Sequence, residues 1–94
     1  MLEKDIETNV CQWAKKQGLL VYKFTSPVKR SVPDRLFIGP GPRFAFIEFK
    51  APLRTPTPNQ DREMDRLKRL NVPVAWFSDT DGAKKWLAKI LLGC

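Results

Sequence analysis

Hydrophobic and polar positions divide the chain into stretches of two kinds. Residues 3–17 repeat apolar positions at helical spacing and stop at Gly18, whereas residues 19–24 form a continuous apolar run that predicts a strand. Two further apolar runs, 36–38 and 44–47, flank the Gly-Pro-Gly-Pro segment 39–42, which favours a turn. We therefore expect these two runs to pair as a β-hairpin.

The second half of the chain continues the same two patterns. Residues 57–60, Thr-Pro-Asn-Gln, form a capping box with proline at the first helical position, which predicts a helix to about Leu70. Residues 72–77 are a short apolar run typical of a buried strand, and Asp79 or Asp81 then caps a last helix. The stripe of this helix that we expect to be buried is Ala83, Trp86, Leu87, Ile90 and Leu91.

The order α-β-β-β-α-β-α predicts an α/β fold with a mixed β-sheet flanked by helices. A helix connects the third and fourth strands, so we expect that pair to be parallel with a right-handed crossover. The length of 94 residues predicts one domain covering positions 1–94.

Charge and composition then narrow the function. The net charge of +7 favours a polyanionic partner, most commonly nucleic acid, although a basic domain without such a role is the alternative. No apolar stretch reaches membrane-spanning length, so we expect no membrane partner. The chain has no histidine, which excludes histidine-based nucleophilic and metal chemistry. Its two cysteines, Cys11 and Cys94, lie far apart, which argues against a zinc site or disulfide framework and suits a reducing cytoplasm.

Two carboxylates and one amine lie where the hairpin strands would bring them together. Asp34 opens the first strand, and Glu48 and Lys50 lie at the end of the second, on one face because strand side chains alternate. Magnesium typically takes one or two carboxylates from a protein, and water and substrate phosphate complete its coordination. A neighbouring lysine can orient the attacking water or stabilise charge on a phosphate. This pattern favours phosphodiester hydrolysis, and the alternative is a solvated face of alternating charge.

Three more polar residues are candidates for the same site. Glu3 falls inside the edge of the apolar face of the first helix, whereas Glu7 lies about 40° nearer solvent at about 100° per residue. A buried acid needs a partner, so Glu3 is the first candidate for a further metal ligand and Glu7 the second. The alternative for Glu3 is a first-turn acid that only favours the helix dipole. Gln60 faces the side of Met64 and Leu67, where it could contact the metal site or a phosphate, or only close the capping box.

Five basic residues surround these candidates in the sequence, on a strand end and in loops. They could position a phosphate backbone, which requires charge but no base recognition, and the alternative for each is an ordinary surface charge. They are Lys23, Lys29, Arg30, Arg35 and Arg54. The cations of the second predicted helix are interpreted as a solvated face, with DNA contact as the alternative. They are Arg62, Arg66, Lys68 and Arg69.

These residues resemble the PD-(D/E)xK nuclease superfamily, and the pattern is most similar to its virus-type replication-repair nuclease (VRR-NUC) family. The matching stretches follow the order of the family and span nearly the whole chain. They are residues 3–7, 23–24, 32–35, 46–52 and 57–60. Phe49 departs modestly from the family, because it fills the x of the ExK motif, where a smaller aliphatic residue is commoner.

The resemblance implies a restriction-endonuclease-like core and DNA cleavage that depends on Mg²⁺ or Mn²⁺. It implies Asp34 and Glu48 as metal ligands and Lys50 as the catalytic lysine. The glutamate of the first helix in the family maps to Glu3 by the spacing Glu-x-x-Ile, or to Glu7 by its distance from Gly18. Gln60 matches the family's glutamine after the ExK strand.

Minimal members of this family resemble Holliday-junction resolvases that act as homodimers. The resemblance therefore implies a structure-selective DNA endonuclease that cuts four-way junctions as a homodimer, in the cytoplasm of a bacterium or phage-infected cell. Trp76, Phe77 and the last helix are candidates for the dimer surface. The alternatives are a basic nucleic-acid-binding module without catalysis, and a flap nuclease, exonuclease or RNA-directed enzyme with the same ion chemistry.

Overall fold

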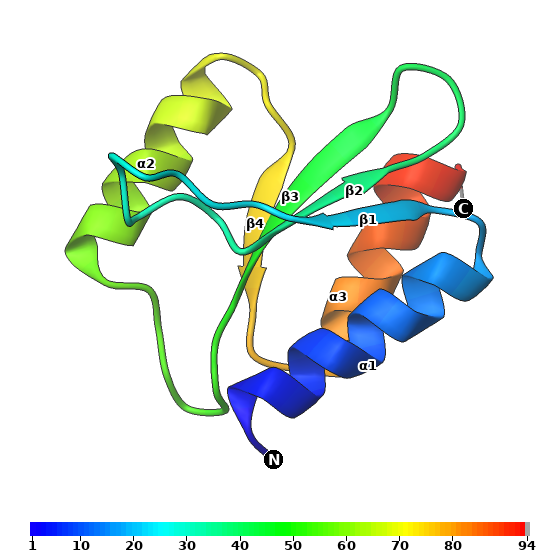
Figure 1. Ribbon diagram of the computed structural model, residues 1–94, viewed down its shortest axis with the longest axis horizontal. Helices are drawn as coiled ribbons and strands as arrows, with labels where there is room; N and C mark the ends of the chain where they lie inside the picture. The colour runs from blue at the N-terminus through cyan, green and yellow to red at the C-terminus, as the bar shows by residue number, and fades with distance from the viewer. Residues whose placement is uncertain (94) are drawn as a thin grey trace.

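A mixed sheet with strand order β1-β2-β3-β4 and three helices makes up the fold (Figure 1). The computed structural model describes residues 1–93, and Cys94 lies outside the described residues. The elements are α1 (Glu3–Lys16), β1 (Leu20–Lys23), β2 (Arg35–Ile38), β3 (Phe44–Phe49), α2 (Pro58–Arg69), β4 (Val74–Phe77), α3 (Thr80–Leu87) and the π-helical turn η1 (Ala88–Leu92). This order confirms the α-β-β-β-α-β-α prediction. Within residues 1–93, no helix is long and apolar enough to cross a membrane.

Strand pairing confirms both the hairpin and the parallel crossover. β1 and β2 pair antiparallel, as do β2 and β3, whereas β3 and β4 are parallel. The hairpin closes where Ile38 faces Phe44, and the Gly39 N–H donates to the Arg43 carbonyl at 3.0 Å. Gly41 has a φ of 69°, in the left-handed region that favours glycine, which explains a glycine at this position of the turn.

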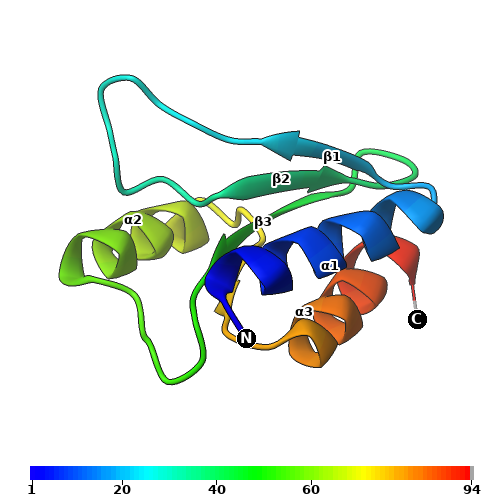
Figure 2. The ribbon, with the colours of Figure 1, turned by 60° about the horizontal axis from the view of Figure 1, so that its bottom comes forward.

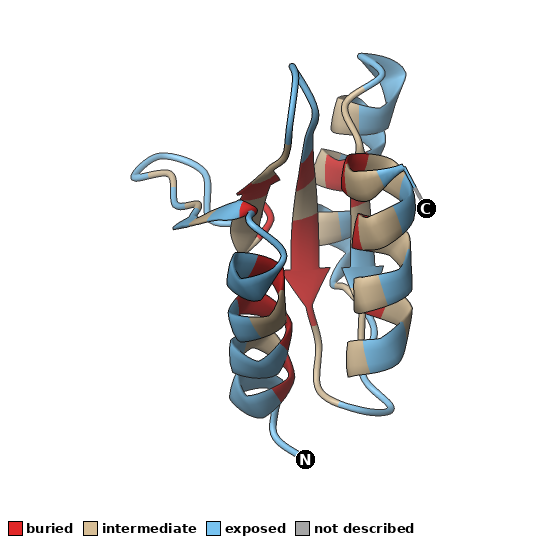
Figure 3. Cartoon of the chain, turned by 90° about the vertical axis from the view of Figure 1, so that its right-hand side faces the viewer, coloured by how far each residue is buried: buried red, intermediate tan, exposed pale blue. Residues whose placement is uncertain are grey.

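The core lies between the sheet and the pair α1 and α3, which cover the same face (Figure 2). β3 runs through the middle and is the most deeply buried strand (Figure 3). In α3 and η1, Ala83, Leu87 and Leu91 are fully buried and Trp86 and Ile90 pack against them, as the periodicity predicts. α2 lies apart from this pair and contacts β4.

The opposite face of the sheet carries apolar side chains that remain accessible. Leu20 and Tyr22 of β1 are 55% and 53% exposed, and Phe44 of β3 is 38% exposed. Strand alternation and pairing register place their neighbours on the same face. We call the accessible apolar part of this surface the open face; its residues are Leu20, Tyr22, Leu36, Ile38, Phe44, Phe46 and Trp76. The same register places the buried residues Val74 and Glu48 on this side of the sheet, next to Phe46 and Trp76.

The expectation of a buried strand at residues 72–77 is wrong in one respect. β4 is an edge strand, so Trp76 is 36% exposed, although Val74 is buried. The apolar run predicts a strand, but it does not tell whether that strand has a neighbouring strand on both sides or on one side only. The expected role of Phe77 and the last helix as a dimer surface stays a prediction, although part of their apolar surface is used inside the fold. Phe77 packs on Trp86 with ring centroids 5.8 Å apart, and the helix stripe faces the core.

Candidate active site

Asp34 is fixed at the end of the sheet by hydrogen bonds to both neighbouring strands. Its N–H donates to the Ile47 carbonyl at 3.1 Å, and its carbonyl accepts from the Phe24 N–H at 2.9 Å. Its Oδ2 accepts from the Phe49 N–H at 2.8 Å. The carboxylate is therefore held one residue before β2, where the chain leaves the basic loop 25–32.

Glu48 on β3 is the one charged residue buried among residues 1–93, with 3% of its surface exposed. Its Oε2 accepts a hydrogen bond from Gln60 Nε2 at 3.0 Å and lies 3.6 Å from Lys50 Nζ. The Lys50 N–H donates to the Phe77 carbonyl at 2.9 Å, so pairing with β4 fixes the backbone beneath the amine. Glu48 and Lys50 thus lie together on one face, as alternation predicts.

Gln60 combines both roles that its position in the capping box left open. Its Oε1 accepts from the Thr57 N–H at 2.9 Å, and its own N–H donates to Thr57 Oγ1 at 3.2 Å. The same amide group still directs Nε2 to Glu48. The start of α2 therefore positions a donor against the buried carboxylate.

Repulsion and burial destabilise the charged forms of both carboxylates. Burial, followed by the nearby Asp34 carboxylate, raises the pKa of Glu48 to about 8, against the opposing effect of Lys50. Burial also raises the pKa of Asp34, which the Phe49 hydrogen bond opposes and Glu7 and Glu3 reinforce. A cation placed between the two carboxylates would relieve both effects.

The donor set fits a hard divalent cation. Within residues 1–93, no group of three or more His, Cys, Asp or Glu residues lies close enough to hold a metal. Asp34 and Glu48 would supply a pair of oxygen ligands, a number that suits ions such as Mg²⁺ and Mn²⁺, which take their remaining ligands from water and phosphate.

The relative placement of Glu3 and Glu7 corrects the helical-wheel expectation. Glu7 is half-buried, and Glu3 is exposed, lining a hollow of about 530 Å³ beside Lys50 and Arg54. Cys11, one turn after Glu7, is buried, so the buried face of α1 extends over the side of Glu7. Neither glutamate contacts Asp34 or Glu48 directly among the described hydrogen bonds, and both act on Asp34 through charge.

Arg35 also differs from its expected role as a residue that contacts nucleic acid. Its Nε donates to Glu7 Oε2 at 2.6 Å, and both side chains are largely shielded from solvent. Strand alternation directs the Arg35 side chain to the face that packs on α1, where its guanidinium group pairs with Glu7. We therefore remove it from the set of residues proposed to contact nucleic acid.

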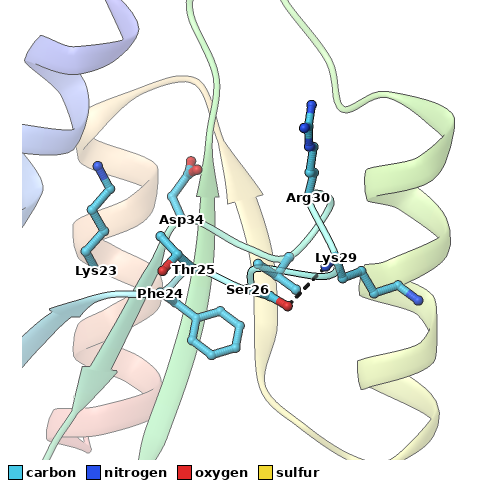
Figure 4. Close-up of a pocket in the computed structure, with 8 residues that line it drawn as sticks. Lys23, Phe24, Thr25, Ser26, Lys29, Arg30 and Asp34 are labelled. Carbon is cyan, nitrogen blue, oxygen red and sulfur yellow. Dashed lines mark hydrogen bonds between the residues drawn. The ribbon is translucent and has the colours of Figure 1, made fainter.

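The remaining basic candidates lie on either side of the carboxylates. Lys23, Lys29 and Arg30 line a hollow of about 250 Å³ that Asp34 borders. In the view of Figure 4, Lys23, Arg30 and Asp34 all extend upward, whereas Lys29 extends towards α2. Arg54 lies in the hollow beside Lys50.

Sequence reasoning missed Glu63. Its side chain is 12% exposed, and Oε1 lies 3.6 Å from Lys29 Nζ and 3.9 Å from Arg66 Nη1. Within residues 1–93 this oxygen has no hydrogen-bond partner. Glu63 follows Gln60 by three residues on α2, so helical spacing alone could have placed it beside the predicted site.

Comparisons with known proteins agree with this geometry. No family sequence model matches the chain. The chain is 42% identical over 79 residues to "Putative nuclease p44" of Acyrthosiphon pisum secondary endosymbiont phage 1, covering 84% of this chain and 85% of that protein. A solved structure described as "VRR_NUC domain" matches with a TM-score of 0.83 and 25% identity, over 93% of this chain and 94% of that one. The chain belongs to the virus-type replication-repair nuclease (VRR-NUC) family.

Proposed function

We propose that the protein is a metal-dependent, structure-selective DNA endonuclease. The observation that carries this proposal is the convergence of Asp34, the buried Glu48 and Lys50 at one end of the sheet, with Gln60 bound to Glu48. Membership of a nuclease family supports DNA as the substrate class, as does the net charge of +7.

Each side chain has a distinct task in phosphodiester hydrolysis. When bound, Mg²⁺ or Mn²⁺ would polarise the scissile phosphate and lower the pKa of the attacking water. Asp34 and Glu48 would hold the cation, and Gln60 keeps Glu48 in one orientation by its 3.0 Å hydrogen bond. Lys50 carries its ammonium group beside Glu48, where it orients the water in line with the leaving oxygen or stabilises the charge forming on the phosphate.

We further propose that the substrate is a four-way DNA junction and that the active species is a homodimer. Two symmetric cuts require two active sites, which a two-fold dimer provides. The open face supports this proposal, because its seven residues are uncharged. The chain carries a net charge of +7, so two copies that met through charged surfaces would repel each other. The buried free thiol of Cys11 suits a reducing cytoplasm as the working compartment.

The direct test is cleavage of matched substrates by the purified protein. Four-way junction, flap, linear duplex and single-stranded DNA are incubated with Mg²⁺ or Mn²⁺, and with a chelator as the control. Paired symmetric nicks confined to the junction are expected. Indiscriminate degradation would contradict junction selectivity, and cleavage of only the flap or of chain ends would indicate a flap nuclease or exonuclease.

Replacing Asp34 separates an enzyme from a binding module. Asp34→Ala is expected to abolish cleavage and retain junction binding, because it removes one metal ligand and leaves the basic residues. Asp81→Asn, an exposed acid of α3, is the matched control and should cleave normally. If the unmodified protein binds DNA but never cleaves it under any metal condition, the chain is a binding module.

A further inference from the structure

Hollows connect the active site to the start of α2. The hollow bordered by Asp34 shares Arg30 with a second hollow of about 230 Å³. This second hollow reaches Gln60, the residue that donates to Glu48. Adjoining hollows therefore lead from Asp34 to the side of α2.

Two further hollows continue this series along α2. The second hollow shares Ser31 and Asn59 with a third of about 180 Å³, which lies between the loop and the helix. The third shares Arg62 and Arg66 with a fourth of about 220 Å³ that ends at Arg69. We call the second, third and fourth hollows together the α2 groove.

The walls of the α2 groove are strongly basic. Arg62, Arg66 and Arg69 recur at spacings of four and three residues, so they line one side of α2, and all three are exposed. Lys29 and Arg30 face them from the loop, and the acids in the groove are Glu63 and Asp65. Five cations against two acids leave a net positive groove.

The loop side of the groove is attached to α2. The ion pair of Glu63 with Lys29 joins the loop to α2, and Arg66 lies near the same carboxylate oxygen. Figure 1 shows the loop running beside α2. A loop that an ion pair holds against α2 costs less to order when an anion binds there.

We propose that the α2 groove binds the phosphates of one DNA strand as it leaves the active site, an inference that rests on the proposed nuclease function. The arginines of α2, interpreted from sequence as a solvated face, then form a second contact surface outside the catalytic site. From Gln60 to Arg69 the helix rises about 14 Å, at about 1.5 Å per residue. This matches about four nucleotides of a duplex strand, at about 3.4 Å each.

An acidic protein segment is the other occupant that such charges could attract. Continuity with the hollow of Asp34 favours DNA, because a strand positioned for cleavage must extend beyond the scissile phosphate. The competition experiment below includes this alternative as an outcome.

The test measures DNA binding in a chelator, so that it does not depend on cleavage. A fluorescently labelled four-way junction is titrated at several salt concentrations, and gels confirm that the DNA stays intact. Arg62→Gln, Arg66→Gln and Arg69→Gln are combined in one variant, with far-UV circular dichroism and melting temperature as folding checks. The matched control, Lys16→Gln with Lys85→Gln and Lys89→Gln, removes three exposed lysines of α1, α3 and η1.

The arginine variant is expected to weaken binding at least tenfold. The slope of log affinity against log salt should fall by about two to three, because each phosphate contact contributes about 0.9. The lysine control should leave the slope unchanged. Arg→Lys at the same three positions should retain the slope because charge is kept, which separates lost contacts from a folding defect.

Equal losses in the arginine variant and the lysine control would overturn the proposal, because net charge alone would then explain binding. Polyglutamate that displaces the junction from the unmodified protein but not from the arginine variant would instead indicate an acidic protein partner. If the nuclease proposal fails and no substrate is cut, the salt slopes still decide whether the α2 groove binds DNA.

Discussion

At the scale of single residues, Glu48 concentrates the electrostatic cost of the site. A carboxylate that is 3% exposed and close to Asp34 has few ways to keep its charge, and Lys50 and Gln60 compensate only in part. A structural role would be served as well by an apolar residue of similar size, since replacing buried ions by apolar groups is often neutral or stabilising. Under the proposed function, a bound cation would offset this cost.

This cost predicts how the stability of the metal-free protein depends on pH. The pKa of Glu48 rises from 4.5 in the unfolded chain to about 8 in the fold, so between these values the folded state binds more protons. The free energy of unfolding should then fall as pH rises from about 4.5 to 8. At about 1.4 kcal/mol per pKa unit, the loss should amount to a few kcal/mol, shared by the coupled carboxylates Glu48 and Asp34.

Thermal melts in a chelator between pH 5 and 8.5 would measure this dependence. Glu48→Gln does not titrate and should reduce the dependence, and the raised pKa of Asp34 accounts for the part that remains. In separate melts without chelator, added Mn²⁺ should raise the melting temperature more at pH 8 than at pH 6, because ligands must be deprotonated to bind. Parallel pH profiles for the unmodified protein and Glu48→Gln would show that Glu48 is not the group responsible.

The sequence allowed the prediction of those site residues whose positions follow from strand alternation and capping rules. Glu48 and Lys50 share a face because they are two apart on β3, and Gln60 sits at the third position of a capping box. The pairing of Glu7 with Arg35 was not predictable, because it depends on the rotation of α1 against β2. The helical-wheel prediction for α1 did not count Cys11 among the apolar residues of the buried face. Cys11 is buried, so this face extends further towards Glu7 than predicted.

At the scale of elements, the ion pair between Glu7 and Arg35 fixes α1 to β2 next to Asp34. Replacing either residue by alanine is expected to lower the free energy of unfolding by about 1 to 2 kcal/mol, given a charged hydrogen bond that is partly screened. A double-mutant cycle measured by urea denaturation should give a coupling energy of about 1 kcal/mol. If the two losses in unfolding free energy are additive, the 2.6 Å contact between Glu7 and Arg35 contributes no coupling energy between α1 and β2.

The start of α2 separates stability from catalysis. Thr57→Ala removes the side-chain oxygen that accepts from the Gln60 N–H, so we expect a loss of about 1 kcal/mol in unfolding free energy and near-normal cleavage. Gln60→Glu keeps the capping acceptor but replaces the donor to Glu48 by an acid. Cleavage should fall at least tenfold without a comparable loss in melting temperature. Equal activity in both variants would contradict a positioning role for Gln60.

Element order and the hairpin were predictable because turn residues and periodicity are local signals. The edge position of β4 was not, because an apolar strand on the edge and one in the centre have similar compositions. Trp76 shows the difference: its neighbours along the chain are those of a buried strand, yet only β3 pairs with it. The exposure of Trp76 therefore follows from the order of the strands in the sheet and not from the local sequence.

At the scale of the whole molecule, the open face bears on the number of subunits. The sheet has helices α1 and α3 on one face, and the other face presents Leu20, Tyr22 and Phe44 with large exposed fractions. Contiguous apolar surface of this kind marks an interface in soluble proteins more often than scattered exposed residues do. The seven open-face residues include no basic side chain, so a DNA backbone is a poor occupant of that part of the sheet face, whereas Glu48, opposite Trp76, lies at its active-site end.

Tyr22→Glu tests whether the open face joins two copies. The carboxylate would be buried without a partner in a two-fold interface, and two copies would place like charges near each other. We expect light scattering after size-exclusion chromatography to report a dimer for the unmodified protein and a monomer for the variant. Val28→Glu is the control, since Val28 is 93% exposed but lies in the basic loop. A dimer that survives Tyr22→Glu would place the interface elsewhere.

Cleavage by the monomeric variant then tests whether the dimer couples the two cuts. If it does, the variant should nick one strand of a four-way junction and leave the symmetric position intact. Paired nicks by a monomer would show that resolution does not need two sites at once.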